Sequence, residues 1–261
     1  MLTAVKAKMT FGKESYSCKI EFTWTDTIKE NKYSSYNIFF EIYNAMFNLA
    51  VCYYNMGTIV AKEATEKMGH KEACNYFKYA MYLFDVIKEE ACTKIPEKEL
   101  PFDLFQPHLD YCKVLCELNG QLEIYHIAKE ANPTMYALHG KLLNVVSQLF
   151  RRARFLADGP QTKKGTKDEY LNYFINRENY YKGLMCKEYR EETKKIFKDK
   201  GEDYGLMIVY QGLFVTHLLE CEKTINKCGN LVDKNAFEKM LSDEKNEGAE
   251  MQGLNDRIYH Q

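Results

Sequence analysis

One short pattern in the sequence has residue types that could hold a metal. Glu123 and His126 are three residues apart in a segment with helical periodicity, which places both side chains on one face of a helix. Bundles that bind two metals through carboxylates use this spacing, but they need a second copy and two further inward glutamates. The sequence holds one copy. We therefore expect this pair to pack rather than to bind metal, and we expect no cofactor.

The remaining histidines and cysteines complete no other site. The other histidines are scattered, and no His-x-x-x-His or Cys-x-x-Cys pattern occurs. Cys112 and Cys116 lie one helical turn apart, and we interpret them as packed thiols. Nine cysteines spread singly through the chain are typical of a reduced, cytosolic protein. A glycine-rich phosphate loop and a Gly-x-Ser-x-Gly motif are also absent. The sequence favours a protein that is not an enzyme.

Basic side chains gather around one predicted helix end and the loop after it. The set consists of Arg151, Arg152, Arg154, Lys163, Lys164 and Lys167. One interpretation is that cations complement the dipole at the end of the helix, with a solvated loop beyond. The other is a docking patch for acidic lipid headgroups or for an acidic partner helix. A net charge of −1 provides no wider field, which favours the first interpretation and argues against nucleic-acid binding.

The segment after Pro133 carries apolar residues at helical spacing. They are Met135, Leu138, Leu142, Val145 or Val146, and Leu149. A stripe of this kind is usually core. It can instead line an exposed groove that receives an amphipathic helix. The pattern alone does not choose between the two.

The elements that would position these residues begin with a β-hairpin. Residues 16–24 alternate strictly, with Tyr16, Cys18, Ile20, Phe22 and Trp24 on one face, which predicts a strand with that face buried. Val5–Phe11 alternates more weakly, and we expect it to pair with this strand across Gly12–Glu14.

A long apolar helix is predicted from Tyr36 to Met56. Apolar residues cover more than half of its circumference, which is typical of a helix buried between others. We therefore expect it to be the central helix, with Ser34 or Ser35 as its N-cap and Gly57 as its end.

Everything that follows is predicted to be helical and to form one elongated domain over residues 1–261. Expected helices are Thr58–Met68, Lys71–Cys92, His108–Ala131, a helix capped by Thr134 and ending near Leu156, Asp168–Lys200, Gly205–Lys227 and Lys234–Glu247, followed by a tail over 248–261. The hairpin would occupy about 5–24 and the helical body about 34–247. Long helices with short connections imply antiparallel neighbours. The longest apolar stretch, Met207–Leu219, is interrupted by polar residues, so we expect no membrane span.

Several segments, in order along the chain, resemble the Bro1 domain, the ALIX-type module of the ESCRT machinery. Ile20–Asp26 is similar to the family's strand ending in Phe-x-Trp-x-Asp, and Phe40–Ala50 to its Glu-x4-Leu-Phe-Asn helix. Tyr76–Glu89 resembles its helix ending in Ile-Lys-Glu, and Asn119–Gln121 its Gln-Ala-Gln segment. Asn255–His260 resembles its Asn-Asp-x-Ile-Tyr-His close. The resemblance implies a mainly α, elongated, boomerang-shaped domain with tetratricopeptide-like helix hairpins and a small N-terminal β-hairpin.

The resemblance also implies a function. It indicates a non-enzymatic, cytoplasmic adaptor, recruited peripherally to endosomes, that binds the C-terminal amphipathic helix of an ESCRT-III subunit in multivesicular body formation. The alternative is a membrane-surface or protein-interaction scaffold that has lost ESCRT-III binding. Two further expectations are contact with an acidic membrane surface and self-association. The second arises because the family has a longer segment before its hairpin, so the N-terminal end of this chain is shortened.

The family's partner-binding patch maps onto four residues. Ile124 matches an aromatic position in one helix, while Leu138 and Leu142 match two aliphatic positions in the next. Lys71 matches a basic residue beside the patch that could meet acidic residues of the partner. Leu138 and Leu142 are four residues apart and so share a helix face. The alternative is that Ile124, Leu138 and Leu142 all belong to the core.

Overall fold

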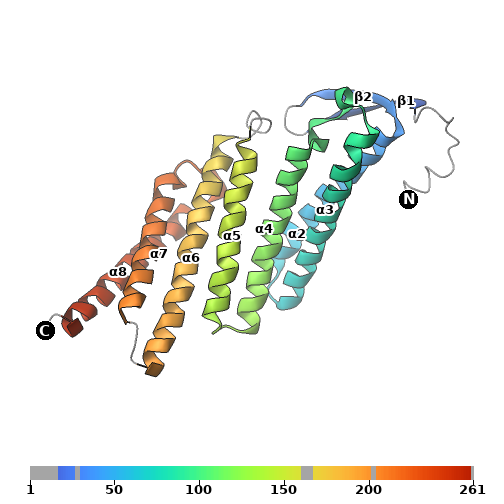
Figure 1. The fold of residues 1–261 in the computed structure, drawn as a ribbon. Helices are drawn as coiled ribbons and strands as arrows, with labels where there is room; N and C mark the ends of the chain where they lie inside the picture. Colours follow the sequence, from blue (N-terminus) through green and yellow to red (C-terminus); the bar gives the residue numbers. More distant parts are fainter. Residues whose placement is uncertain (1–16, 27–29, 160–166, 201–203, 260–261) are drawn as a thin grey trace.

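The computed structural model describes residues 17–26, 30–159, 167–200 and 204–259. Within these ranges the chain forms a two-stranded antiparallel sheet followed by seven α-helices (Figure 1). The strands are β1 (Ser17–Thr25) and β2 (Lys32–Asn37). The helices are α2 (Ile38–Glu63), α3 (Lys67–Lys94), α4 (Gln106–Ala131), α5 (Tyr136–Ala157), α6 (Asp168–Lys200), α7 (Tyr204–Ile225) and α8 (Lys234–Tyr259). Short 3₁₀ turns, η1 (Glu97–Glu99), η2 (Phe102–Leu104) and η3 (Gly229–Leu231), lie between helices.

Within the described residues, the predicted strand pairs with a segment that the sequence analysis did not predict to be a strand. β1 pairs with β2, with Trp24 opposite Tyr33, whereas the predicted partner Val5–Phe11 lies outside the described residues. The register shifts between Ser17 and Phe22, and Ile20 is 63% exposed. Phe22 and Trp24 pack on the core instead, so the buried face of the strand is shorter than its alternation predicts.

The cap and end predicted for the first helix are wrong. The Asn37 side chain accepts a hydrogen bond from the Phe39 N–H at 2.9 Å, so Asn37 is the N-cap, and Ser34 and Ser35 belong to β2. The helix continues through Gly57 to Glu63. The Phe77 ring of α3 lies so close to Gly57 that an added Cβ would meet it at 2.8 Å. Glycine at this position allows α2 and α3 to approach closely rather than ending α2.

Other helix boundaries also differ from the predictions. Thr58–Met68 is not a separate helix, because Thr58–Glu63 completes α2 and Lys67 begins α3. Thr134 does not cap α5, which begins after Met135 without a side-chain cap. At the other end, α8 continues to Tyr259, so most of the predicted tail is helical.

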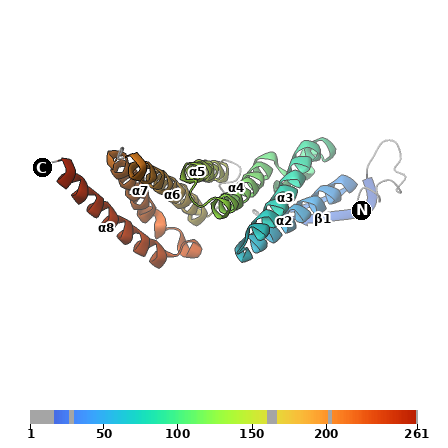
Figure 2. The same ribbon diagram turned by 90° about the horizontal axis from the view of Figure 1, so that it is seen from below.

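The helices form an elongated array in which each packs on the next along the chain. Figure 1 shows α2 to α8 side by side from the hairpin to the C-terminus, and Figure 2 shows them alternating between two layers. This is the predicted boomerang-shaped helical fold with tetratricopeptide-like hairpins. The position predicted for α2 is wrong, because α2 lies at the hairpin end of the array and not at its centre. No helix in the described ranges is long and apolar enough to cross a membrane.

The hairpin end has its own core. Buried side chains of α2 and α3, among them Phe40, Phe47 and Phe84, meet the hairpin and the segment around η2. The indole N–H of Trp24 donates to the Asp103 carboxylate at 3.1 Å, which fixes the sheet to η2. The sheet therefore rests on the helices, as a two-stranded hairpin must.

Candidate helix-binding groove

Residues of helices α3, α4 and α5 line a surface groove of about 300 Å³. Its apolar lining includes Met81 from α3, Ile124 from α4, and Val145 and Leu149 from α5. Gly120 also lines the groove, and its lack of a side chain leaves space there. A Cβ added at Gly120 would have only the Phe77 side chain within 4 Å, at 3.9 Å. Lys78 and Glu117 also line the groove, so an apolar floor is combined with one charge of each sign.

The outer face of α5 carries the exposed part of the apolar stripe predicted from the sequence. α5 buries Leu143, Val146 and Phe150, of which Val146 and Phe150 pack with α4 and α6. Four apolar side chains then remain partly or largely accessible at steps of three and four: Leu138, Leu142, Val145 and Leu149. This spacing places them along one side of the helix.

The three predicted apolar site residues are not core. Ile124 is 41% exposed and Leu138 is 37% exposed, whereas Leu142 is half-buried. Ile124 lines the groove itself. Leu138 and Leu142 continue the α5 stripe beyond the groove towards the N-terminus of the helix, and they are not part of its lining.

The predicted basic residue lies apart from the groove. Lys71 is exposed and lines a separate hollow with Met68 and Glu130. The lysine in the groove is Lys78, two turns further along α3. The sequence analysis missed Lys78 and Met81. It named Val145 (or Val146) and Leu149 as part of the apolar stripe after Pro133 but did not assign them to the patch. The helical spacing of seven residues from Lys71 and from Leu142 could have indicated Lys78 and Leu149.

Polar contacts connect α3 and α4 near Ile124. His70 Nδ1 lies 2.6 Å from a Glu123 carboxylate oxygen, and the His70 and His126 rings stack with centroids 5.2 Å apart. Burial lowers the pKa of His126. Burial also raises the pKa of the Cys74 thiol, and the negative charge of Glu123 raises it further. Across the described ranges, no three or more His, Cys, Asp or Glu side chains are arranged to hold a metal ion. The Glu123 carboxylate thus joins two helices.

Two arginines of the basic stretch at the end of α5 form ion pairs with acidic side chains of the same chain. Arg152 lies 3.3 Å from Glu117, and Arg154 lies 3.6 Å from Glu178. Lys163 and Lys164 fall outside the described residues. Two of the three arginines therefore contact acidic side chains of neighbouring helices.

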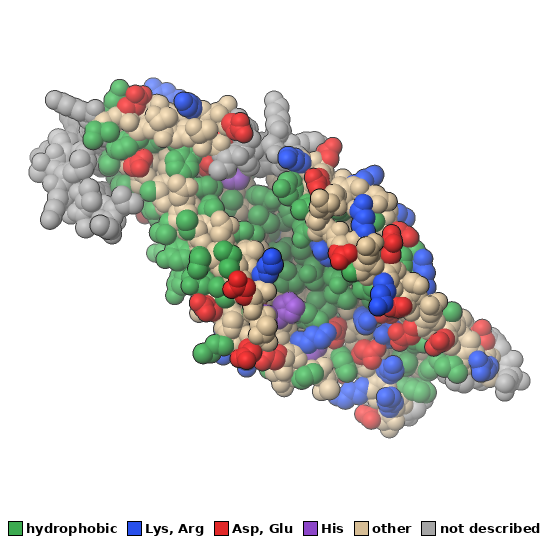
Figure 3. Space-filling view, turned by 180° about the vertical axis from the view of Figure 1, so that it is seen from behind, with side chains coloured by type: hydrophobic (Ala, Val, Ile, Leu, Met, Phe, Trp, Pro, Cys, Tyr) green, Lys and Arg blue, Asp and Glu red, His purple; other side chains and the backbone are tan. Residues whose placement is uncertain are grey.

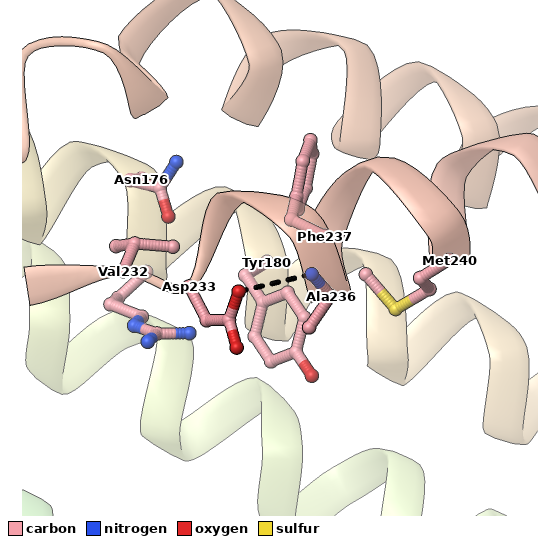
Figure 4. Close-up of a pocket in the computed structure, with 8 residues that line it drawn as sticks. Asn176, Tyr180, Val232, Asp233, Ala236, Phe237 and Met240 are labelled. Atoms are coloured by element: carbon pink, nitrogen blue, oxygen red, sulfur yellow. Dashed lines mark hydrogen bonds between the residues drawn. The ribbon is translucent and has the colours of Figure 1, made fainter.

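A second hollow, of about 160 Å³, lies between α6 and the start of α8 (Figure 4). The Asp233 carboxylate accepts from the Ala236 N–H at 3.1 Å, which caps α8. The Arg177 guanidinium lies 5.4 Å from the centroids of both the Tyr173 and Tyr180 rings. The Asn176 amide donates to the Cys221 carbonyl at 3.0 Å. The Asn176 contact therefore joins α6 to α7, whereas the contacts of Asp233 and Arg177 stay within their own segments.

The fold and the groove define a class of protein: an elongated helical array with an apolar surface groove. The chain belongs to the BRO1-like domain family, whose sequence model matches residues 1–261. A curated relative, the ALG-2 interacting protein X of Dictyostelium discoideum, is 29% identical over 130 residues. That match covers 48% of this chain and 15% of the relative, so the chain corresponds to a small part of that protein.

Solved structures share the fold at low sequence identity. The complex of the ALIX BRO1 domain with CHMP4C has a TM-score of 0.79 at 16% identity, over 100% of this chain and 69% of that chain. ALIX in complex with the SIVmac239 late domain PYKEVTEDL has a TM-score of 0.74 at 16% identity, over 99% and 35%. A structure that explains endosomal targeting by the Bro1 domain has a TM-score of 0.71 at 17% identity, over 93% and 64%. These neighbours bear on this chain through the fold alone.

Proposed function

We propose that this chain is a non-enzymatic adaptor whose α3–α4–α5 surface binds the C-terminal amphipathic helix of an ESCRT-III subunit. Binding would recruit it from the cytoplasm to endosomes during multivesicular body formation. The observation that carries the proposal is the accessible apolar stripe of α5 beside Ile124, in a chain that belongs to the BRO1-like family. Two solved neighbours, complexes with CHMP4C and with a late-domain peptide, support a peptide-binding role.

The groove suits a helix with apolar anchors on one face. Anchors lying against Ile124, Val145 and Leu149 would leave water, and each fully buried leucine-type side chain contributes about 1.5–3 kcal/mol. Leu138 and Leu142 would extend the contact along α5. Lys78, inside the groove, and Lys71, nearer the helix ends, would face acidic residues of the partner. Such charges at the edge of an interface add specificity and association rate more than affinity.

The test is binding of a fluorescent ESCRT-III C-terminal peptide, followed by anisotropy. We expect saturable, micromolar binding by the wild type and an affinity lower by about 10- to 100-fold for Leu142→Asp, because the aspartate removes one anchor and places a charge in an apolar contact. Ile124→Asp alters a more exposed side chain and should have the same effect. Leu213→Asp, at an exposed leucine of α7 far along the array, is the matched control.

Circular dichroism separates loss of the site from loss of the fold. If Leu142→Asp and Ile124→Asp are both folded and bind as well as the wild type, the groove is not the site. If the folded wild type binds no ESCRT-III helix, the adaptor proposal fails. The chain would then be a scaffold of the same fold that has lost ESCRT-III binding.

A further inference from the structure

Helix α2 presents a second exposed apolar stripe, on the side away from the core. Its inner side buries Phe40, Phe47 and Ala50. The outer side carries four exposed apolar side chains at helical spacing: Leu49, Cys52, Met56 and Ile59. Leu49 is 46% exposed, Met56 43% and Ile59 51%. A helix that is apolar on both sides is normally covered on both sides.

The surroundings of this outer stripe are also apolar. Tyr79 of α3 is exposed, and its ring centroid lies 5.5 Å from that of Tyr53, at the edge of α2. α2 is the first helix that the structure describes. Among the described residues it has α3 on one side and no helix on the other. Hydrophobic side chains reach the surface along this end of the molecule (Figure 3). Within the described part of the chain, the face at this end of the array is therefore apolar, where repeat-like folds usually place a polar one.

The outer stripe has no charge of its own. From Ile42 to Ala61 no residue is Asp, Glu, Lys, Arg or His, although 28% of the chain is Asp, Glu, Lys or Arg. A charged partner could form no ion pair with this stripe, and acidic lipid headgroups would have no cation to bind there. The occupant that suits this face is another uncharged apolar helix face, and a second copy of this chain supplies one.

We propose that the outer stripe of α2 is the contact between two copies of this chain, which form a symmetric dimer with antiparallel α2 helices. A two-fold contact brings the same residues of both copies together, which is unfavourable for a charged face and favourable for a neutral apolar one. Antiparallel helices also place the positive end of one dipole beside the negative end of the other. This dimer goes beyond the proposed adaptor function, because it uses a different surface.

The symmetry gives Cys52 a diagnostic position. The helical spacing of the outer stripe continues from Leu49 back to the half-buried Ala45, and Cys52 lies midway between Ala45 and Ile59. In a symmetric antiparallel pair, the two copies of Cys52 would meet near the two-fold axis. Packed helix axes are about 8–10 Å apart, which allows facing cysteines to reach the Cα separation of a disulfide, roughly 4.4–6.8 Å.

Sedimentation equilibrium tests the dimer directly. We expect the wild type to show a concentration-dependent monomer–dimer equilibrium. Met56→Glu with Ile59→Glu should raise the dissociation constant at least about tenfold, because at each end of the contact two carboxylates of one copy would lie against apolar side chains of the other copy. The matched control is Leu206→Glu with Val209→Glu on α7, which also has exposed apolar residues in an uncharged segment. This control should leave the equilibrium unchanged.

Oxidative cross-linking of the wild type tests the geometry of the contact. With copper–phenanthroline as oxidant, two Cys52 thiols should lose two protons and two electrons to the oxidant and form one S–S bond between copies. Cys52→Ser should abolish the cross-linked dimer and still sediment as a dimer. Cys92→Ser, at the other described exposed cysteine, should cross-link as the wild type does.

Three results would overturn the proposal. One is a wild type that stays monomeric at about 100 µM, a concentration well above a micromolar dissociation constant. Another is loss of association in the α7 control, which would indicate a head-to-tail contact and open polymers. The third is a cross-link that persists in Cys52→Ser. Circular dichroism confirms that each variant is folded, and a wild type that does not cross-link counts against the geometry even if a charged variant unfolds.

Discussion

Two exposed apolar stripes of this molecule, on α5 and on α2, differ in what surrounds them. The α5 stripe borders a groove between three helices, and charged groups such as Lys78 and Glu117 line that groove. The α2 stripe lies on the outer side of the end helix, in a segment without charged residues. A recessed stripe with flanking charges favours a foreign amphipathic helix in a defined orientation. A neutral outward face favours a copy of itself. We therefore propose different partners for the two stripes, because their surroundings differ.

The largest effect should come from removing two anchors of the groove together. Ile124→Asp combined with Val145→Asp removes about 3–6 kcal/mol of burial from peptide binding, a loss of more than about 100-fold. Both side chains are 41% exposed, so the free energy of unfolding should change little. Anisotropy with the fluorescent peptide and a urea titration measure the two quantities. Retained binding would contradict the role of the groove.

The second prediction is that peptide binding at the α5 stripe and dimerisation through the α2 stripe are independent of each other. The α5 variant Leu142→Asp should leave the sedimentation equilibrium unchanged, and Met56→Glu with Ile59→Glu should leave peptide affinity unchanged, because the two surfaces share no residues. Each variant is measured in both assays. If either variant changes both properties, the two surfaces are coupled, and the comparison made above fails.

A smaller effect concerns charge. Lys78→Ala should weaken peptide binding by up to about fivefold, since a partly exposed ion pair contributes at most about 1 kcal/mol. It should also reduce the dependence of affinity on salt, because one screened attraction is lost. The α2 dimer should be insensitive to the same salt range. Titrations at low and high salt measure both, and a dimer that dissociates with salt would argue against a neutral contact.

The smallest effect should come from pH at the hairpin end. Burial lowers the pKa of His108, which packs against Phe47 and Phe102, and the nearby Asp103 carboxylate opposes this shift only in part. A histidine with a lowered pKa binds its proton more weakly when folded than when unfolded. Its contribution to stability is therefore present above the unfolded pKa of about 6.5 and is lost as the pH falls below it. Urea titrations at pH 7 and pH 5.5 should show lower stability at pH 5.5, and His108→Gln should reduce the difference.

Local periodicity predicted the helices because it depends on neighbouring residues. The apolar spacing located α4, α6 and α7 to within a few residues at each end, and alternation located β1. β2 was missed because Lys32–Asn37 is mostly polar and its pairing depends on β1 and on contacts with η1. Gly57 was taken as an end because a glycine stop and a glycine that accommodates Phe77 look the same in sequence.

The sequence by itself determined the helical class, the elongated array of antiparallel helices, the resemblance to the Bro1 domain and the candidate stripe of α5. Tertiary structure alone decided which stripes are accessible. Ile124 and Leu138 became surface residues because α5 and its neighbours leave one side uncovered, and α2 became an end helix because of its place in the array. An apolar stripe has the same spacing whether or not another helix covers it, so only the packed neighbours distinguish core from binding surface.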